Sequence, residues 1–213
     1  MTKLLLFSDL HGDIAAAERL VPSAADVDIV VGAGDFGQMR HGVSITLDVL
    51  SQISTPAILV PGNAESEEEL ASAAKNWRSA HVLHGSGITI GGVSFFGLGG
   101  GIPRAIGDWS YELGEDEASA LLRDCPSGGV LVTHTPPRGA VDSTGAGVRI
   151  GSTAVRAIVE DKQPALVVCG HVHNCWERQA MIGRCVVVNA GPRGIPWNLH
   201  RDRPGPAQNH AEF

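Results

Sequence analysis

Short apolar segments recur along this chain, and each ends in a polar or glycine-rich turn. Their lengths and their content of β-branched residues predict β-strands, several of which are buried on both faces. A weaker strand is predicted at about Trp176–Met181. The stronger predicted strands are Lys3–Phe7, Val27–Val31, Ala57–Val60, Val82–Leu83, Ile88–Ile90, Val93–Leu98, Val130–Val132, Ala165–Cys169 and Cys185–Val188.

Helical patterns lie between several of these strands. Apolar residues at helical spacing, acidic first turns and a capping serine at Ser152 all favour helices. Strands and helices alternate three times, a cluster of strands follows, and a strand, a helix and three strands end the pattern. This order predicts an α/β protein with two sheets rather than one parallel sheet. The predicted helices are Asp13–Val21, Val43–Ser51, Ser66–Trp77, Glu115–Arg123 and Ser152–Asp161.

The length of 213 residues is typical of one domain, at about 150 residues per domain. We predict a single domain over residues 1–200 and a frayed tail over residues 201–213, which has little apolar content. Two long glycine-rich connections, Gly99–Gly114 and Pro136–Gly151, interrupt the regular pattern. Loops of this length inside a compact domain are usually functional or disordered.

Charge and hydropathy limit the classes of partner. The net charge is −7 and the chain has no run of Lys or Arg, which makes binding to extended nucleic acid or to an anionic membrane unlikely. No apolar run reaches the length of a signal-peptide core, about 7–15 residues, or of a spanning helix, about 20. The four cysteines form no Cys-x-x-Cys pair and are predicted to be buried thiols in a reducing compartment. We therefore expect a cytoplasmic protein.

Polar residues follow five of the predicted strands, at the points where the strands end. In α/β proteins, ligand sites gather beyond the carboxyl ends of strands. Oxygen ligands mixed with imidazole nitrogens suit first-row divalent ions such as Mn, Fe, Zn or Co. The set is too large for one tetrahedral ion and fits two, the usual arrangement for polarising a phosphoryl group. These residues are Asp9, His11, Asp35, Asn63, His134, His171 and His173.

The polar motifs resemble those of the calcineurin-like metallophosphoesterase superfamily. In chain order they are Asp9-Leu10-His11, Gly34-Asp35, Gly62-Asn63, His134 and Gly170-His171-Val172-His173. Three further segments are similar to the Icc-related group of predicted phosphoesterases, namely Thr133–Pro137, Gly151-Ser152 and Val187–Pro192.

The resemblance implies a four-layer α/β/β/α sandwich of two mixed sheets flanked by helices, with a dinuclear metal centre between the sheet ends. It also implies that a hydroxide bridging the two metals attacks phosphorus, in line with the leaving oxygen. By the same resemblance, Asp9, His11 and His173 would hold the first metal, Asn63, His134 and His171 the second, and Asp35 would bridge both.

One position departs from the superfamily pattern. A histidine that assists the leaving group often follows the asparagine, whereas Asn63 is followed here by Ala64. General acid catalysis contributes roughly 10²–10⁴-fold, so its loss should affect poor leaving groups most. Either His41 or His84 substitutes, or the substrates have good leaving groups, or the activity is low or absent. We expect phosphodiesters or activated esters, and we interpret Glu65 as an acid of the following helix.

Arginines in the two long loops are candidates for substrate binding, because guanidinium groups bind phosphate in a fork. They are Arg149, Arg104 and Arg138, and the alternative for each is an ordinary surface charge. The loop aromatics Trp109 and Tyr111 are more typical of residues that fold a loop down than of residues that stack a base.

The sequence leaves two other functions open. A non-catalytic scaffold of the same fold is disfavoured by the complete ligand set, and a nuclease is disfavoured by the acidic balance of the chain. Two divalent ions would outweigh the charges of Asp9 and Asp35 and make the site locally cationic. We therefore expect a small phosphate ester as the substrate.

Overall fold

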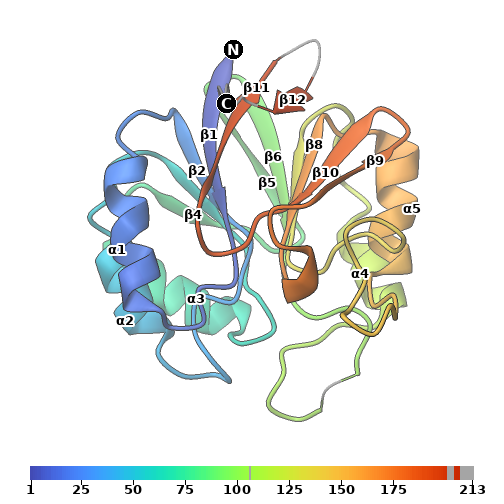
Figure 1. The fold of residues 1–213 in the computed structure, drawn as a ribbon, viewed down its shortest axis with the longest axis horizontal. Coiled ribbons are helices and arrows are strands. Elements are labelled where there is room, and N and C mark those ends of the chain that lie inside the picture. The colour runs from blue at the N-terminus through green and yellow to red at the C-terminus, as the bar shows by residue number, and fades with distance from the viewer. Residues whose placement is uncertain (106, 201–203, 207–213) are drawn as a thin grey trace, which may run out of the picture.

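Two six-stranded sheets face one another in the computed structural model, which describes residues 1–105, 107–200 and 204–206 (Figure 1). The strand order is β12-β11-β1-β2-β3-β4 in the first sheet and β5-β6-β7-β8-β10-β9 in the second. Helices cover the outer face of each sheet, so the layers are helix, sheet, sheet and helix. This is the predicted four-layer α/β/β/α sandwich, and the prediction is confirmed.

The first sheet contains four parallel strands, β1 to β4; β11 pairs antiparallel with β1, and β12 pairs antiparallel with β11 at the sheet edge. Helices α1, α2 and α3 pack on its outer face. The strands are β1 (Thr2–Phe7), β2 (Ile29–Gly32), β3 (Ala57–Leu59), β4 (Ala80–Val82), β11 (Ile195–Leu199) and β12 (Pro204–Pro206), and the helices are α1 (Ile14–Ser23), α2 (Val43–Leu50) and α3 (Glu67–Ala73), followed by the 3₁₀ turn η1 (Ala74–Asn76).

The second sheet contains the parallel strands β6, β7, β8 and β10, with antiparallel strands β5 and β9 at its two edges. Helices α4 and α5 cover its outer face. The strands are β5 (Ser86–Ile90), β6 (Val93–Leu98), β7 (Val130–Thr133), β8 (Leu166–Cys169), β9 (Gln179–Ile182) and β10 (Cys185–Asn189), and the other elements are α4 (Glu115–Leu121), α5 (Thr153–Lys162) and the 3₁₀ turn η2 (His173–Cys175).

The alternation of side chains along β1 explains the layering. Leu4 and Leu6 are buried in the core between the two sheets, whereas Leu5 and Phe7 are buried in the core between the first sheet and its helices. Successive side chains of a strand point to opposite faces, so an uninterrupted apolar run is what a strand between two apolar layers requires. The four cysteines are buried thiols, as predicted.

Apart from small shifts of element ends and from β12, which lies in the predicted tail, three elements differ from the sequence-based prediction. Strand β11 was not predicted, because Pro196 and Asn198 alternate with its buried residues and its partner β1 lies at the opposite end of the chain. The predicted helix Ser66–Trp77 ends earlier, at Ala73, and continues as η1. The weak strand predicted at Trp176–Met181 lies at Gln179–Ile182, because η2 and the following turn occupy its first part.

The predicted tail falls mostly outside the described residues. Of residues 201–213 the structure describes 204–206, whose backbone pairs with β11. The domain boundary at residue 200 stays a prediction. Within the described part of the chain, none of the helices combines the length and the apolar character that crossing a bilayer demands.

Candidate metal centre

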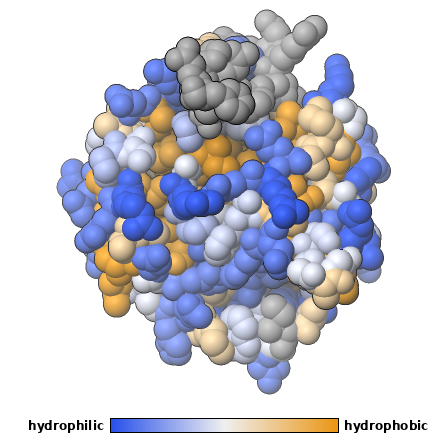
Figure 2. Space-filling view, in the orientation of Figure 1, coloured by the Kyte–Doolittle hydropathy of each residue, from blue (hydrophilic) through white to orange (hydrophobic). Residues whose placement is uncertain are grey.

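The seven predicted metal ligands lie on loops that follow the carboxyl ends of strands in both sheets. Strands β1, β2 and β3 of the first sheet and β7 and β8 of the second precede these loops. The strand ends point to the lower part of Figure 1, and Figure 2 shows mainly hydrophilic residues on that part of the same face. The site therefore lies where the two sheets meet, as the sequence predicted for a shared edge.

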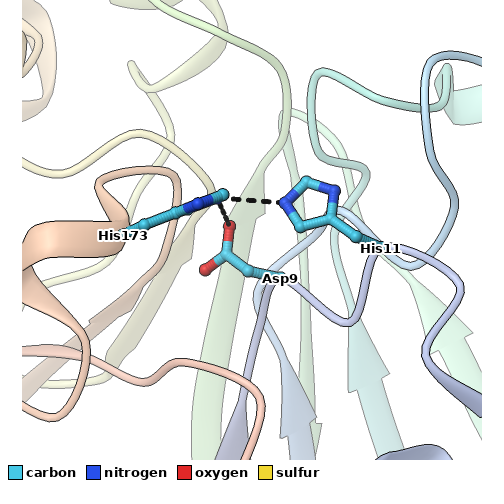
Figure 3. Close-up of side chains that lie close together, drawn as sticks. All are labelled: Asp9, His11 and His173. Atoms are coloured by element: carbon cyan, nitrogen blue, oxygen red, sulfur yellow. Dashed lines mark hydrogen bonds and ion pairs between the residues drawn. The ribbon is translucent and has the colours of Figure 1, made fainter.

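Three of the ligands form the group drawn in Figure 3. His11 Nε2 lies 3.0 Å from His173 Nε2, and His173 Nε2 lies 3.8 Å from Asp9 Oδ1. Potential ligand atoms of all three lie within 4.8 Å of one another. At most one proton can lie between the two facing imidazole nitrogens, so at least one nitrogen lone pair points into the space beside the Asp9 carboxylate. A divalent cation satisfies such a donor set.

A second group surrounds the side chain of Asn63. Its Oδ1 lies 3.1 Å from His134 Nε2 and 3.0 Å from His171 Nδ1. His134 Nδ1 lies 2.8 Å from the carbonyl oxygen of Ala33, which accepts the proton at that nitrogen and leaves Nε2 facing the site. A backbone carbonyl in this position fixes the tautomer of a ligating histidine.

Asp35 lies between the two groups. Its Oδ2 is 3.5 Å from His11 Nε2, and its Oδ1 is 3.4 Å from His134 Nε2. Each carboxylate oxygen thus faces a different group, which is the arrangement that a bridging carboxylate needs. The side chain is buried, and its Oδ1 also accepts a hydrogen bond of 2.8 Å from the backbone of Ala64.

Burial and neighbouring charges shift the pKa values of these groups in the metal-free protein. Burial opposes the charged form of Asp35, yet His134 and His11 hold its pKa below the usual range. Burial also opposes the charged form of His134, but Asp35 outweighs it and raises the pKa of His134 to about 9. Burial, reinforced by His134, lowers the pKa of His171 to about 3, so this imidazole stays neutral and free to bind a metal.

Four of the candidate ligands have left-handed backbone conformations. The φ angles are 54° at Asp9, 48° at His11, 56° at Asp35 and 66° at His171. A non-glycine residue in this region costs about 1–3 kcal/mol and persists only where its surroundings enforce it. Backbone hydrogen bonds of 2.9 Å, from Asp9 to Gly34 and from His11 to Asp35, join the loops after β1 and β2. Four of the nine non-glycine residues with positive φ in the described part of the chain are thus candidate ligands.

At two positions beside the candidate ligands only glycine fits, because a ligand carboxylate lies where a Cβ atom would be. A Cβ atom at Gly62 would lie 2.0 Å from Asp35 Oδ1, and one at Gly170 would lie 2.5 Å from Asp9 Oδ2. Both glycines stand in the sequence motifs, but only the structure shows which candidate ligand each of them accommodates.

Glu65 has a different role from the one the sequence suggested. Its carboxylate is fully buried and accepts hydrogen bonds from the backbone N–H groups of Asp35 (2.8 Å), Gly37 (3.0 Å) and Gly62 (2.8 Å). Helix α3 begins after the N-cap Ser66, so Glu65 lies outside the helix. Burial and the charge of Asp35 raise its pKa to about 7. Glu65 therefore joins the loops that carry Asp35 and Asn63, which local sequence patterning does not reveal.

Ala64, at the position of the missing histidine, is buried, and both of its backbone polar groups are used. Its N–H donates to Asp35, and its carbonyl oxygen accepts from Arg40 at 2.8 Å. The two histidines suggested as substitutes differ in environment. His41 is exposed on the turn before α2, whereas His84 is mostly buried, which lowers its pKa.

The loop after β6 reaches Asn63 through two residues. Ser110 Oγ accepts a hydrogen bond of 3.2 Å from Asn63 Nδ2, and Tyr111 N–H donates to the Asn63 carbonyl oxygen at 2.9 Å. The Tyr111 hydroxyl lies 3.3 Å from His84 Nε2, and Gly99 N–H donates to His84 Nδ1 at 3.2 Å. Ser110 thus orients the amide of Asn63 so that its oxygen faces the histidines, a role that the sequence analysis missed. Tyr111 holds the loop down, as expected.

Each of the three candidate arginines contacts a residue of its own loop or of a neighbouring helix. Arg104 pairs with Glu117 at 2.6 Å, Arg149 pairs with Asp142 at 3.0 Å, and Arg138 Nη1 lies 3.5 Å from the carbonyl oxygen of Arg149. Their side chains are largely exposed. Binding of substrate phosphate by these residues stays a prediction.

Comparison with known proteins identifies the family of this chain. A family model described as calcineurin-like phosphoesterase matches residues 2–175. An uncharacterised protein of Methanocaldococcus jannaschii is 26% identical over 205 residues, which cover 90% of this chain and 88% of that protein.

Two solved structures share the fold at low identity. A Thermus thermophilus protein has a TM-score of 0.73 at 19% identity, covering 93% of this chain and 99% of that one. A dimetal phosphatase from Danio rerio has a TM-score of 0.61 at 14% identity, covering 92% of this chain and 89% of that one.

Proposed function

Because the chain belongs to the calcineurin-like phosphoesterase family, we propose that it is a hydrolase that cleaves phosphate esters with two divalent metal ions. The observation that carries the proposal is the position of Asp35, which directs one carboxylate oxygen to each of two clusters of metal-ligand type. A single carboxylate shared between two such clusters is hard to explain by packing alone.

We assign one metal to Asp9, His11 and His173 and the other to Asn63, His134 and His171, with Asp35 between them. Imidazole nitrogens mixed with carboxylate and amide oxygens suit Mn, Fe, Zn or Co. When bound, such ions supply positive charge that polarises the phosphoryl group and lowers the pKa of water.

The residues of the chain orient the ligands. The Ala33 carbonyl fixes the tautomer of His134, and Ser110 fixes the amide of Asn63. Glu65 holds the loop of Asp35 against the loop of Asn63. Preorganisation of this kind spares the site from reorganising when charge develops in the transition state.

The substrate in this proposal is a small phosphodiester or an ester with a good leaving group. Ala64 provides no imidazole to protonate a leaving oxygen, so esters that need such help should react slowly. The acidic balance of the chain disfavours long polyanions, whereas a small ester needs only the local charge of the metals. Arg149, Arg104 and Arg138 are proposed phosphate contacts.

Of the two histidines suggested as substitutes for the missing one, we favour His84. It contacts Tyr111, which in turn contacts Asn63, whereas His41 is exposed. Gly99 donates to Nδ1 of His84, so the neutral ring carries its proton on Nε2, facing Tyr111.

The test compares hydrolysis of bis-p-nitrophenyl phosphate with hydrolysis of p-nitrophenyl phosphate in the presence of Mn²⁺. We expect metal-dependent turnover with a higher kcat/KM for the diester, and its loss in Asp35→Asn. The matched control is Asp48→Asn, which changes an exposed carboxylate on α2. Absence of turnover with every divalent metal tried, in folded protein, would refute the proposed function.

A further inference from the structure

Trp176 contacts two of the proposed ligands of one metal. Its indole Nε1–H donates a hydrogen bond of 3.1 Å to Asp9 Oδ2. Its ring packs on the imidazole of His173, with centroids 4.5 Å apart and planes inclined by 32°. Trp176 directly follows η2, the turn that begins at His173, so one short segment supplies both a ligand and the group that contacts it.

The two oxygens of Asp9 have different partners. Oδ2 accepts the Trp176 indole N–H and the hydroxyl of Ser8, the latter at 2.5 Å. Oδ1 accepts the backbone N–H of His171 at 2.9 Å and is the oxygen that faces His173. Two donors thus hold Oδ2 away from the metal space, so Asp9 presents a single oxygen to it.

The indole of Trp176 also packs against the backbone at Gly191. A Cβ atom at Gly191 would lie 2.8 Å from the indole ring, so the backbone passes directly against it. Gly191 N–H donates to Ser8 Oγ at 2.9 Å, and Ser8 N–H donates to the Gly191 carbonyl oxygen at 2.9 Å. Ser8, Gly191 and Trp176 therefore form one connected unit around Asp9 Oδ2.

His173 needs such a contact more than the other histidines do. Half of its side chain is exposed, at 51%, whereas the side chain of His134 is fully buried. Packing fixes the ring of a buried histidine, but an exposed ring can rotate away from the metal. The indole of Trp176 packs against the ring of this half-exposed histidine and restricts its rotation.

We propose that Trp176 is a positioning residue for the metal held by Asp9, His11 and His173. It restricts Asp9 to one oxygen and fixes the plane of His173, and so it strengthens this metal site selectively over its neighbour. The proposal rests on the proposed function, because it requires the dinuclear site. Removing a group that orients metal ligands typically weakens metal binding by about 10–100-fold.

The test measures Mn²⁺ binding to the metal-free full chain by isothermal titration calorimetry. Trp176→Phe retains an aromatic ring over His173 and removes the hydrogen bond to Asp9, whereas Trp176→Leu removes both contacts. The matched control is Trp77→Phe, because Trp77 also donates its indole N–H, to the Ile53 carbonyl oxygen at 2.8 Å, in the helix layer of the first sheet.

We expect two binding events in the wild type. In Trp176→Phe one event should weaken by about 10–100-fold and the other should stay within about threefold. Trp176→Leu should weaken the same event further, and Trp77→Phe should change neither. Unchanged affinities in Trp176→Phe, or equal weakening of both events, would overturn the proposal.

A second variant guards against a folding defect. Ser8→Ala removes the other donor to Asp9 Oδ2, and it should weaken the same event as Trp176→Phe. If it weakens the other event or neither, the positioning role is wrong. Failure of the proposed function is distinguishable, because the wild type itself would then bind no stoichiometric Mn²⁺.

Discussion

At the scale of the residue, the candidate site depends on side chains that are not themselves candidate metal ligands. Glu65, Ser8, Ser110 and Trp176 each bond to a candidate ligand or to its loop. They restrict the orientation of the donor groups, which is how residues outside a ligand set commonly tune a metal site. A ligand set without them would have the right atoms and poor geometry.

Glu65→Gln tests this dependence. The carboxylate accepts three backbone N–H groups, and an amide would turn its NH₂ toward at least one of them. A buried donor left without an acceptor costs about 1–3 kcal/mol, so we expect the free energy of unfolding to fall by that amount. Urea denaturation in chelator measures it, with Glu18→Gln on the exposed face of α1 as the control. Equal stability of the two variants would contradict the role assigned to Glu65.

The sequence could indicate which candidate ligands share one edge but not the residues that support them, and the reason is physical. Asp9, Asp35 and Asn63 follow apolar strands, so their shared edge can be inferred from the pattern. Trp176 reaches Asp9 only through tertiary folding, across most of the length of the chain. Its own neighbourhood reads as an ordinary strand, and this is where the predicted strand was displaced.

At the scale of the element, the long glycine-rich connection Pro136–Gly151 is held by buried polar contacts. Asp142 is buried and accepts from the backbone of Gly139 at 2.8 Å and of Gly151 at 3.3 Å. The loop also contacts η2, because Gly145 N–H donates to Asn174 Oδ1 at 3.0 Å. This loop therefore lies beside His173, at one side of the candidate site.

Arg149 on this loop is the natural test of a substrate role. Its side chain pairs with Asp142 yet stays 55% exposed, so its remaining N–H groups can reach a ligand. A hydrogen bond to a charged group contributes about 1.5–3 kcal/mol, so we expect Arg149→Ala to raise KM for bis-p-nitrophenyl phosphate by about tenfold or more.

The control for this prediction is Arg156→Ala, which also removes an exposed ion pair, with Glu160 on α5. Its KM should equal that of the wild type. If both variants behave alike, Arg149 is an ordinary surface charge, which is the alternative that its sequence position left open.

At the scale of the whole molecule, the candidate site joins two sheets that are otherwise held by apolar contacts. Three ligand loops come from the first sheet and two from the second. The four layers followed from the order of the strands and helices and from the family resemblance. Strand β11 could not be predicted in this way, because it pairs with β1 from the opposite end of the chain and local sequence does not indicate such a pairing.

Metal binding should therefore stabilise the molecule as one unit. A ligand present at 100 times its Kd adds about 2.7 kcal/mol to the free energy of unfolding, so removing two metals with a chelator should lower the thermal midpoint measurably. The places in the chain where metal binding slows exchange test the proposal more sharply than the total gain in stability does. Because each proposed ligand set takes residues from loops of both sheets, protection should rise in both sets of loops together.

Hydrogen–deuterium exchange with and without Mn²⁺ measures that distribution. Slower exchange is expected in the loops after β1, β2 and β3 and in those after β7 and β8. The turns at the opposite ends of the strands, at Gly91-Gly92 and Gly128, serve as the internal control and should not change. Protection confined to the loops of one sheet would contradict both proposed ligand sets, because each set takes residues from both sheets.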